Sequence, residues 1–233
     1  MIRLLVVFLM MAAVPAAAQQ SSGQYAVRAL GLKVGDLTLT GSVSGSKYTV
    51  SSQFVTSGLV GAVAGVKFLL SASGAVRGGQ FRPVRYDEEM ETGSRDSRAS
   101  LRYRNGVARS AGSEIGGAGP YAVTDAQQKG AVDPLTAMFM VMRDQPREGL
   151  CKIRQRIFDG ERLTEVSLTN RSEDGGTVTC TGVFRRVGGY SPEDLARKGQ
   201  FGLSVTYEPA GDLMRAVKMR ADTVHGRATL VRK

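Results

Sequence analysis

The residue types that perform most enzymatic chemistry are scarce in this sequence. His225 is the only histidine among 233 residues, and Cys151 and Cys180 are the only cysteines. A nucleophilic serine needs a general base, most often histidine, and no serine lies in the Gly-x-Ser-x-Gly turn of the common hydrolases. Two cysteines and one histidine so far apart do not form a metal cluster, and no glycine-rich segment has the spacing of a phosphate-binding loop. We therefore predict no catalytic residue, no metal site and no cofactor, and we interpret His225 as a surface or hydrogen-bonded residue of a C-terminal strand.

Four carboxylates are concentrated in one short segment: Asp87, Glu88, Glu89 and Glu91. Paired carboxylates perform general acid and base catalysis in glycosidases, so this segment supports an alternative function, a carboxylate-dependent hydrolase of envelope glycan or ester bonds. Arginines flank the segment, and acidic runs of this kind are more often solvated strand ends or turns. We therefore expect a non-catalytic protein and keep the hydrolase as the alternative.

Basic residues outnumber acidic ones, 31 to 21, which gives a formal net charge of +10. One group lies in an expected strand and a second near the C-terminus, and we predict that they contact an anionic surface: Lys152, Arg154, Arg156, Arg215, Lys218 and Arg220. Phosphates of lipopolysaccharide, anionic phospholipid headgroups or an acidic protein would fit, and so would a generally solvated cationic surface. Nucleic acid is not expected, because aromatic residues make up only 6% and no binding motif is present.

Two apolar segments are the other candidates for a binding site. Segment 59–70 and the methionine-rich segment 135–142 either form simple core or line a concave groove that holds an acyl chain or a hydrophobic peptide. The residues of this predicted groove are Leu59, Val60, Phe68, Leu135, Met138, Phe139 and Met142. The apolar stretch that begins at Leu59 is too short to span a membrane.

Residues 1–18 have the features of a secretory signal peptide. Arg3 precedes an apolar run over residues 4–14, and three alanines follow. Such a run would span about 16 Å as a helix, roughly half of a bilayer core, so it is too short for a membrane anchor. We expect cleavage after Ala18, no attached lipid because no cysteine follows the site, and a periplasmic mature chain, 19–233, that forms one domain.

Export would place both cysteines where thiols oxidise, so we expect a disulfide between Cys151 and Cys180. The Asp159-Gly160 dipeptide suits a two-residue type I′ hairpin turn, which predicts three opposed pairs: Arg154 with Glu165, Ile153 with Val166, and Cys151 with Leu168. In a plain meander the cysteines would then lie two strands apart, about 9.6 Å, beyond the reach of a disulfide. Either Cys151 precedes the regular strand and bends over, or the sheet curls sharply, or the thiols stay free.

Alternation of apolar and polar residues predicts a mainly β protein, with turn residues every eight to twelve positions. The expected strands are 25–30, 36–43, 47–56, 66–73, 80–90, 97–104, 107–115, 151–158, 161–171, 177–187, 201–207, 213–221 and 224–231. A buried helix is expected at about 133–143, where Asp133 and Pro134 form a start signal, and a short surface helix at about 191–198. We expect a strongly curved antiparallel sheet, or an open or partial β-barrel, around the first helix.

Several short motifs resemble a family of exported bacterial proteins, the domain of unknown function 3108 family. They are Tyr25, Gly31-Leu32-Lys33-Val34-Gly35, Tyr48, Ser57-Gly58-Leu59, Ser73-Gly74, Pro83-Val84-Arg85-Tyr86, Asp133-Pro134-Leu135-Thr136-Ala137 and Asp159-Gly160-Glu161-Arg162. The resemblance covers nearly the whole mature chain and implies an exported curved sheet or open barrel without an established enzymatic activity. In outline the chain is also similar to periplasmic β-spiral proteins that maintain the envelope of alphaproteobacteria and carry one disulfide.

The expected function is therefore non-catalytic. We expect a periplasmic protein that supports cell-envelope integrity by binding a lipid or acyl ligand, a lipoprotein or another anionic envelope component in a concave β groove.

Overall fold

The computed structural model describes residues 19–58, 61, 65–92, 96–111 and 119–233. Within these residues, thirteen strands form one antiparallel sheet in the order β7-β6-β5-β4-β3-β2-β1-β13-β12-β11-β10-β9-β8. The strands are β1 (Gln19–Ala29), β2 (Leu32–Ser44), β3 (Lys47–Thr56), β4 (Lys67–Arg77), β5 (Gln80–Glu91), β6 (Asp96–Arg104), β7 (Val107–Ser110), β8 (Ile153–Phe158), β9 (Leu163–Asp174), β10 (Thr177–Gly188), β11 (Gln200–Ala210), β12 (Leu213–Thr223) and β13 (Gly226–Arg232).

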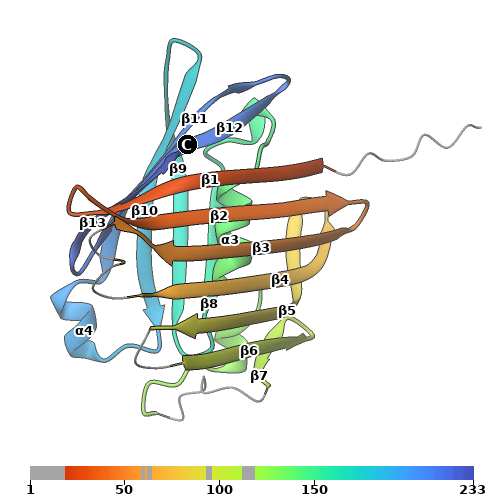
Figure 1. Ribbon diagram of the computed structural model, residues 1–233. Helices are drawn as coiled ribbons and strands as arrows, with labels where there is room; N and C mark the ends of the chain where they lie inside the picture. The colour runs from red at the N-terminus through yellow and green to blue at the C-terminus, as the bar shows by residue number, and fades with distance from the viewer. Residues whose placement is uncertain (1–18, 59–60, 62–64, 93–95, 112–118) are drawn as a thin grey trace, which may run out of the picture.

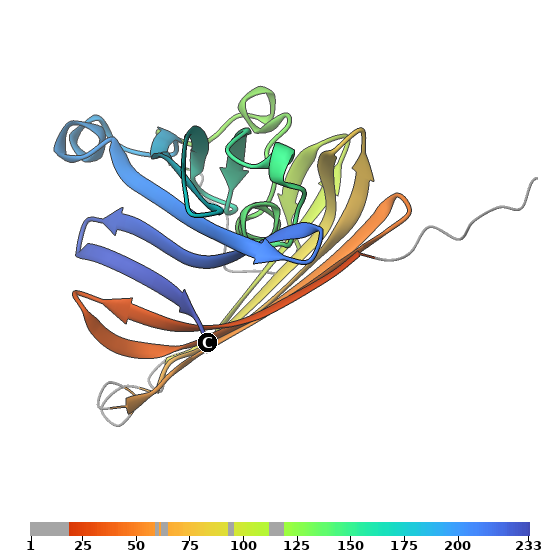
Figure 2. The same cartoon turned by 90° about the horizontal axis from the view of Figure 1, so that it is seen from above.

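The sheet consists of two meanders that meet at the chain ends. Strands β1 to β7 form one half, strands β8 to β13 form the other, and β1 pairs with β13. The sheet curls until its two outer strands, β7 and β8, lie on opposite sides of a central helix (Figures 1 and 2). This confirms the expected mainly β fold, a strongly curved sheet nearly closed into a barrel. One strand is shorter than expected: β7 ends at Ser110, and most of the rest of segment 107–115 lies outside the described residues.

The central helix, α3 (Pro134–Met142), is buried inside the curl, as the sequence predicts. The Asp133 carboxylate caps it by accepting a hydrogen bond from the Thr136 backbone N–H at 2.7 Å. Tyrosines from both halves of the sheet hold the helix: the Tyr48 hydroxyl of β3 lies 2.8 Å from the Thr136 hydroxyl, and the Tyr207 hydroxyl of β11 donates to the Val141 carbonyl at 2.7 Å. The helix therefore joins the two meanders.

The other helical elements of the described residues are short. The predicted surface helix is α4 (Pro192–Arg197), capped by Ser191, whose hydroxyl accepts a hydrogen bond from the Asp194 backbone N–H. Two further short elements were not predicted, α2 (Asp125–Gln128) and the 3-10 turn η1 (Arg147–Gly149), because each is a single turn with no apolar periodicity to reveal it.

Close packing of α3 against β2 depends on Gly41. A Cβ atom at this position would lie 2.5 Å from a carbon of the Phe139 ring. We expect Gly41→Ala to lower the free energy of unfolding by about 1–3 kcal/mol, because the ring or the helix must shift to admit the methyl group. Urea unfolding followed by far-UV circular dichroism measures the change. Thr40→Ala, on the other face of the same strand, is the matched control, and equal stability of the two variants would contradict the packing argument.

The hairpin between β8 and β9 differs from the predicted register by two residues. Ile153 pairs with Leu168, and a four-residue connection replaces the two-residue turn. The Asp159 carboxylate accepts hydrogen bonds from the backbone N–H groups of Glu161 and Arg162, at 2.9 and 2.7 Å, and so builds a longer turn around its own side chain. The register prediction was wrong for this reason. A shift of two residues preserves the side-chain alternation, so it does not change which residues of β8 share a face.

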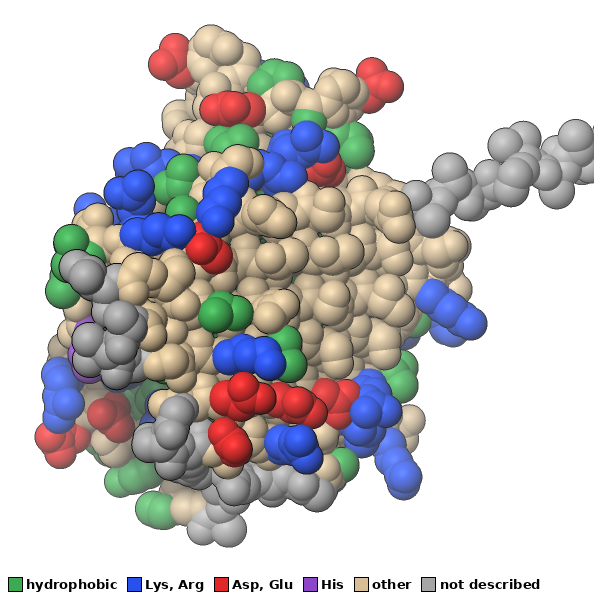
Figure 3. Space-filling model, in the orientation of Figure 1, with side chains coloured by type: hydrophobic (Ala, Val, Ile, Leu, Met, Phe, Trp, Pro, Cys, Tyr) green, Lys and Arg blue, Asp and Glu red, His purple; other side chains and the backbone are tan. Residues whose placement is uncertain are grey.

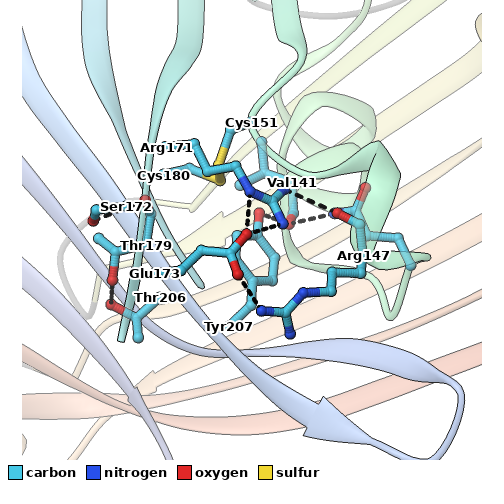
Figure 4. The surroundings of a disulfide bond; sticks show 11 residues. Val141, Arg147, Cys151, Arg171, Ser172, Glu173, Thr179, Cys180, Thr206 and Tyr207 are labelled. Carbon is cyan, nitrogen blue, oxygen red and sulfur yellow. Dashed lines mark hydrogen bonds and ion pairs between the residues drawn. A yellow bond between two sulfur atoms is a disulfide. The ribbon is translucent and has the colours of Figure 1, made fainter. Parts of the chain in front are cut away.

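Cys151 and Cys180 form a disulfide, with their Cα atoms 5.0 Å apart (Figure 4). Strand β8 begins only at Ile153, and its pairing with β9 ends at Leu168, so the chain before β8 is free to cross the inner side of β9 toward β10. Cys151 itself has a left-handed φ of 58° outside the strand. Of the three alternatives left open by the sequence, the first is correct: Cys151 precedes the regular strand and bends over.

Candidate functional site: a basic cleft between the sheet edges

A cleft of about 1150 Å³ lies where the two halves of the sheet approach each other without pairing. One wall is formed by the β4–β5 and β6–β7 turns, and the other by the start of β8 with residues 129–131. The C-terminal end of α3 forms the floor. Beside the cleft, Val132 of the segment before α3 forms an isolated parallel bridge with Ile157 of β8.

The cleft is strongly basic. Seven lining residues carry a positive charge: Arg77, Arg82, Lys129, Arg143, Lys152, Arg154 and Arg156. The acidic lining residue is Glu165, whose carboxylate already pairs with Arg185 at 2.6 Å. Within the described part of the chain, none of the seven forms an ion pair with a carboxylate. Their charges are therefore available to an anionic ligand.

Arg143 is the most enclosed of these cations. It follows the last turn of α3, and its guanidinium carbon lies 5.7 Å from the centre of the Phe81 ring. Its Nε atom is buried without a hydrogen-bond partner among the described residues. Burial lowers the pKa of Arg143, so holding this group as a cation is unfavourable without an anion. A partly buried arginine without a carboxylate partner suits bidentate recognition of a phosphate or carboxylate.

Tyr103 also lines the cleft and carries a second polar atom without a partner in the described part of the chain. The Tyr103 hydroxyl is buried and has no partner in the described residues. Burial raises the pKa of Tyr103, so the hydroxyl keeps its proton and can donate a hydrogen bond. Phe81, Met140 and Ile153 supply apolar surface beside it. The cleft therefore combines cations with an apolar wall.

The structure brings together one of the two predicted basic groups. Lys152, Arg154 and Arg156 line the cleft, whereas Arg215, Lys218 and Arg220 lie on β12 and do not. Arg215 is paired with the buried carboxylate of Asp144 at 2.7 Å. Sequence reasoning missed Arg77, Arg82, Lys129 and Arg143, because they come from separate segments and no local pattern connects them.

Three residues predicted to line an apolar groove lie in the core instead. Leu135, Phe139 and Met142 are fully buried in the core, because the sheet curls around α3 and covers it from both halves. Met138 is partly buried against the same core. Phe68 of β4 is also partly buried and lies beside Phe54, with 6.0 Å between the ring centres. Leu59 and Val60 lie outside the described residues.

Each carboxylate of the acidic segment has a partner that is not another carboxylate, although Asp87 and Glu89 line one pocket. Asp87 accepts hydrogen bonds from Arg85, from Ser100 at 2.7 Å and from Arg102 at 3.1 Å. Although burial opposes ionisation, these bonds hold the pKa of Asp87 below its usual value. The other three have separate partners: Glu88 accepts from the Tyr86 hydroxyl, Glu89 pairs with Arg98 and Glu91 with Lys67. Figure 3 shows the acidic band on the outer face, bordered by basic side chains.

His225 lies in the turn between β12 and β13, not in a strand as predicted. It is exposed, and its backbone N–H donates to the Thr223 hydroxyl at 3.1 Å. The turn forms because the Thr223 side chain also donates to the Gly226 carbonyl. Among the residues placed by the structure, no three histidine, cysteine or carboxylate groups could hold a metal ion. No helix of those residues is long and apolar enough to cross a membrane.

Comparisons with known proteins identify the family. The model of the family described as "Protein of unknown function (DUF3108)" matches residues 24–191. A crystal structure of a β-barrel-like protein of domain of unknown function DUF1849 from Brucella abortus aligns over 94% of this chain and 97% of that one, with a TM-score of 0.39 and 11% identity. No curated protein matches the sequence. Because the family model covers well over half of the chain, the protein belongs to the DUF3108 family of proteins of unknown function.

Proposed function

We propose that this protein is a non-catalytic periplasmic protein that supports cell-envelope integrity by binding an anionic lipid in the basic cleft. The observation that carries the proposal is the set of seven basic side chains, among them the enclosed Arg143, none of which pairs with a carboxylate among the described residues. The signal-peptide features of residues 1–18 support export, and the disulfide is typical of an oxidising compartment.

A lipid fits the cleft better than a small inorganic anion does. The volume of about 1150 Å³ exceeds the usual range for drug-sized ligands and leaves room for more than a headgroup. Phe81, Met140 and Ile153 would contact an acyl chain, while Arg143 and the exposed cations of the cleft wall would contact the phosphate. A free phosphate ion would leave the apolar wall exposed.

The partners of the acidic side chains support a non-catalytic role. Asp87 is held ionised by three donors, and Glu88 shares a hydrogen bond with Tyr86 and not with a second carboxylate. A glycosidase needs two carboxyl groups that face each other across the substrate. Asp87 and Glu89 line one pocket, but each already pairs with an arginine.

Calorimetric titration of the mature chain with dihexanoyl phosphatidylglycerol, kept below its micelle concentration, tests the proposal. We expect Arg143→Met to weaken binding about tenfold or more, because a charge-assisted hydrogen bond in an enclosed site is lost. Arg197→Met, on the exposed face of α4, is the matched control.

Two further arms make the test decisive. Dihexanoyl phosphatidylcholine should bind at least tenfold more weakly than the anionic lipid. The exposed pair Lys152→Ala/Arg154→Ala should reduce affinity without disturbing the core, which covers the case in which Arg143→Met does not fold. Equal affinity for the two lipids, or unchanged affinity in a folded cleft variant, would overturn the proposal.

A further inference from the structure

A second surface, at the other end of the barrel from the β4–β5 turn, combines exposed apolar turns with uncompensated positive charge. Leu30 and Leu32, at the β1–β2 turn, are 73% and 71% exposed, and Val224 at the β12–β13 turn is 52% exposed. The two turns are neighbours, since the Leu30 backbone N–H donates to the Arg227 carbonyl at 3.1 Å. Figures 1 and 2 show both turns at the same end of the sheet, with α4.

Leu30 is an unfavourable residue for this turn in two respects. Its φ is 51°, in the left-handed region where a Cβ atom is sterically disfavoured and glycine or asparagine is usual. Its side chain is also largely exposed. A residue that costs stability in the folded protein while burying little apolar surface points to a function.

The outer face next to these turns carries a row of like charges. In the register of the sheet, Arg28 of β1 lies opposite Lys33 of β2 on one side and Thr229 of β13 on the other. Thr229 in turn lies opposite Arg220 of β12. Like charges at opposed positions destabilise a sheet. Lys33 pairs with Asp36 at 3.0 Å, whereas Arg28, Arg220 and the nearby Lys218 form no ion pair among the described residues. Figure 3 shows this basic group on the outer face near the end of β1 and β13.

We propose that this end of the barrel docks on an anionic phospholipid bilayer, with Leu30, Leu32 and Val224 inserted below the headgroups and the row of Lys33, Arg28 and Arg220 against the phosphates. Exposed aliphatic turns beside a cluster of cations match a membrane interface in both polarity and charge. An acidic protein would engage the cations but would leave two leucines without a reason to be at the turn. This surface does not include the basic cleft, so the inference does not depend on the proposed ligand.

Vesicle flotation of the mature chain provides the test. We expect binding to phosphatidylcholine vesicles that contain phosphatidylglycerol, little binding to pure phosphatidylcholine, and a decline in binding as salt increases. Leu30→Asn/Leu32→Ser should weaken the partition constant at least tenfold, because two aliphatic side chains no longer leave water. Asparagine tolerates the left-handed turn, so this variant should fold at least as well as the wild type.

Matched controls separate insertion from general effects. Tyr121→Ser removes an exposed apolar side chain elsewhere and should leave partitioning unchanged. Arg28→Ala/Arg220→Ala should reduce binding several-fold and flatten its salt dependence, whereas Arg98→Ala/Arg104→Ala removes the same charge from β6 without that effect. Absence of wild-type binding to the anionic vesicles, or wild-type binding by the Leu30→Asn/Leu32→Ser variant, would overturn the inference.

Discussion

The Cys151→Ser/Cys180→Ser variant is expected to lose about 3.6 kcal/mol of unfolding free energy relative to the oxidised wild type. The disulfide closes a loop with a sequence separation of 29 residues, which contains the entire β8–β9 hairpin. In the chain-entropy model, opening a loop of this length raises the conformational entropy of the unfolded chain, which lowers the free energy of unfolding by that amount. The loss would be a large fraction of the total stability of an ordinary domain.

The same substitution should loosen one wall of the cleft. Cys151 is the residue immediately before Lys152, and it fixes the chain between η1 and β8 against β10. Nearby, Arg171 donates to the Arg147 carbonyl at 2.9 Å, and Glu173 pairs with both arginines (Figure 4). These exposed ion pairs contribute little on their own, so the disulfide supplies most of the constraint.

Urea unfolding followed by far-UV circular dichroism, with and without reductant, measures the effect. Reductant should destabilise the wild type to about the level of the double variant and leave the variant unchanged. Thiol labelling of the native protein is the control for the oxidised state. Equal labelling with and without reductant, or a stability loss below about 1 kcal/mol, would contradict the prediction.

The second large effect is a pH dependence of stability that originates at Asp133. Burial raises the pKa of this carboxyl from 3.8 to about 6, despite hydrogen bonds from the Thr136 hydroxyl and backbone N–H. Between pH 3.8 and 6 the folded protein therefore binds a proton that the unfolded chain does not. The stabilisation that this proton provides is fully present below pH 3.8, the pKa of the unfolded chain, and is lost as the pH rises through 6, the pKa of the folded protein. The change amounts to about 3 kcal/mol.

Asp133→Asn should remove this dependence. Asparagine caps a helix as well as aspartate does, and its amide can donate to the Thr136 hydroxyl, which can then donate to Tyr48. The stability of the variant relative to the wild type should rise by up to about 3 kcal/mol from pH 4 to pH 7.5. Urea unfolding at several pH values measures the difference. Asp125→Asn is the contrasting control, because the hydrogen bond from Arg109 lowers the pKa of Asp125 and its contribution is lost on acidification instead.

A constant difference between Asp133→Asn and the wild type across this pH range would show that the buried carboxyl does not titrate in the folded protein. The result would also bear on the core, since Asp133 and Thr136 join α3 to Tyr48 of β3. Weakening this connection would loosen the contact between the helix and one half of the sheet.

The elements of this fold could be predicted because their signals are local. Strand β3 (Lys47–Thr56) alternates buried and exposed side chains along nearly its whole length, and its bounds agree with the expected segment. Helix α3 begins where an aspartate and a proline predict a start. The hairpin register failed at Asp159, where a side chain bonded to the backbone of its own turn and lengthened it.

Only the residues of the candidate site that lie on or next to one strand could be predicted from the sequence. Lys152, Arg154 and Arg156 alternate along β8 and its approach, so their common face follows from the sequence. Arg143 joins them because α3 ends at the gap between the sheet edges, and Arg82 joins them from the other half of the barrel. No periodicity in the sequence connects Arg82 and Arg143 to this strand, because the curl of the whole sheet brings them to the cleft.

The sequence by itself determined the mainly β class, the helix inside the sheet and the short motifs of the family, because each depends on residue types within a few positions of one another. The tertiary structure decided which edges meet. Pairing of Tyr25 with Arg232 joins the two meanders through residues that lie far apart in the chain. That closure, with the bend at Cys151, places seven cations around one cleft and two leucines at the opposite end. Long-range pairing depends on how all thirteen strands curl together, and no single segment encodes it.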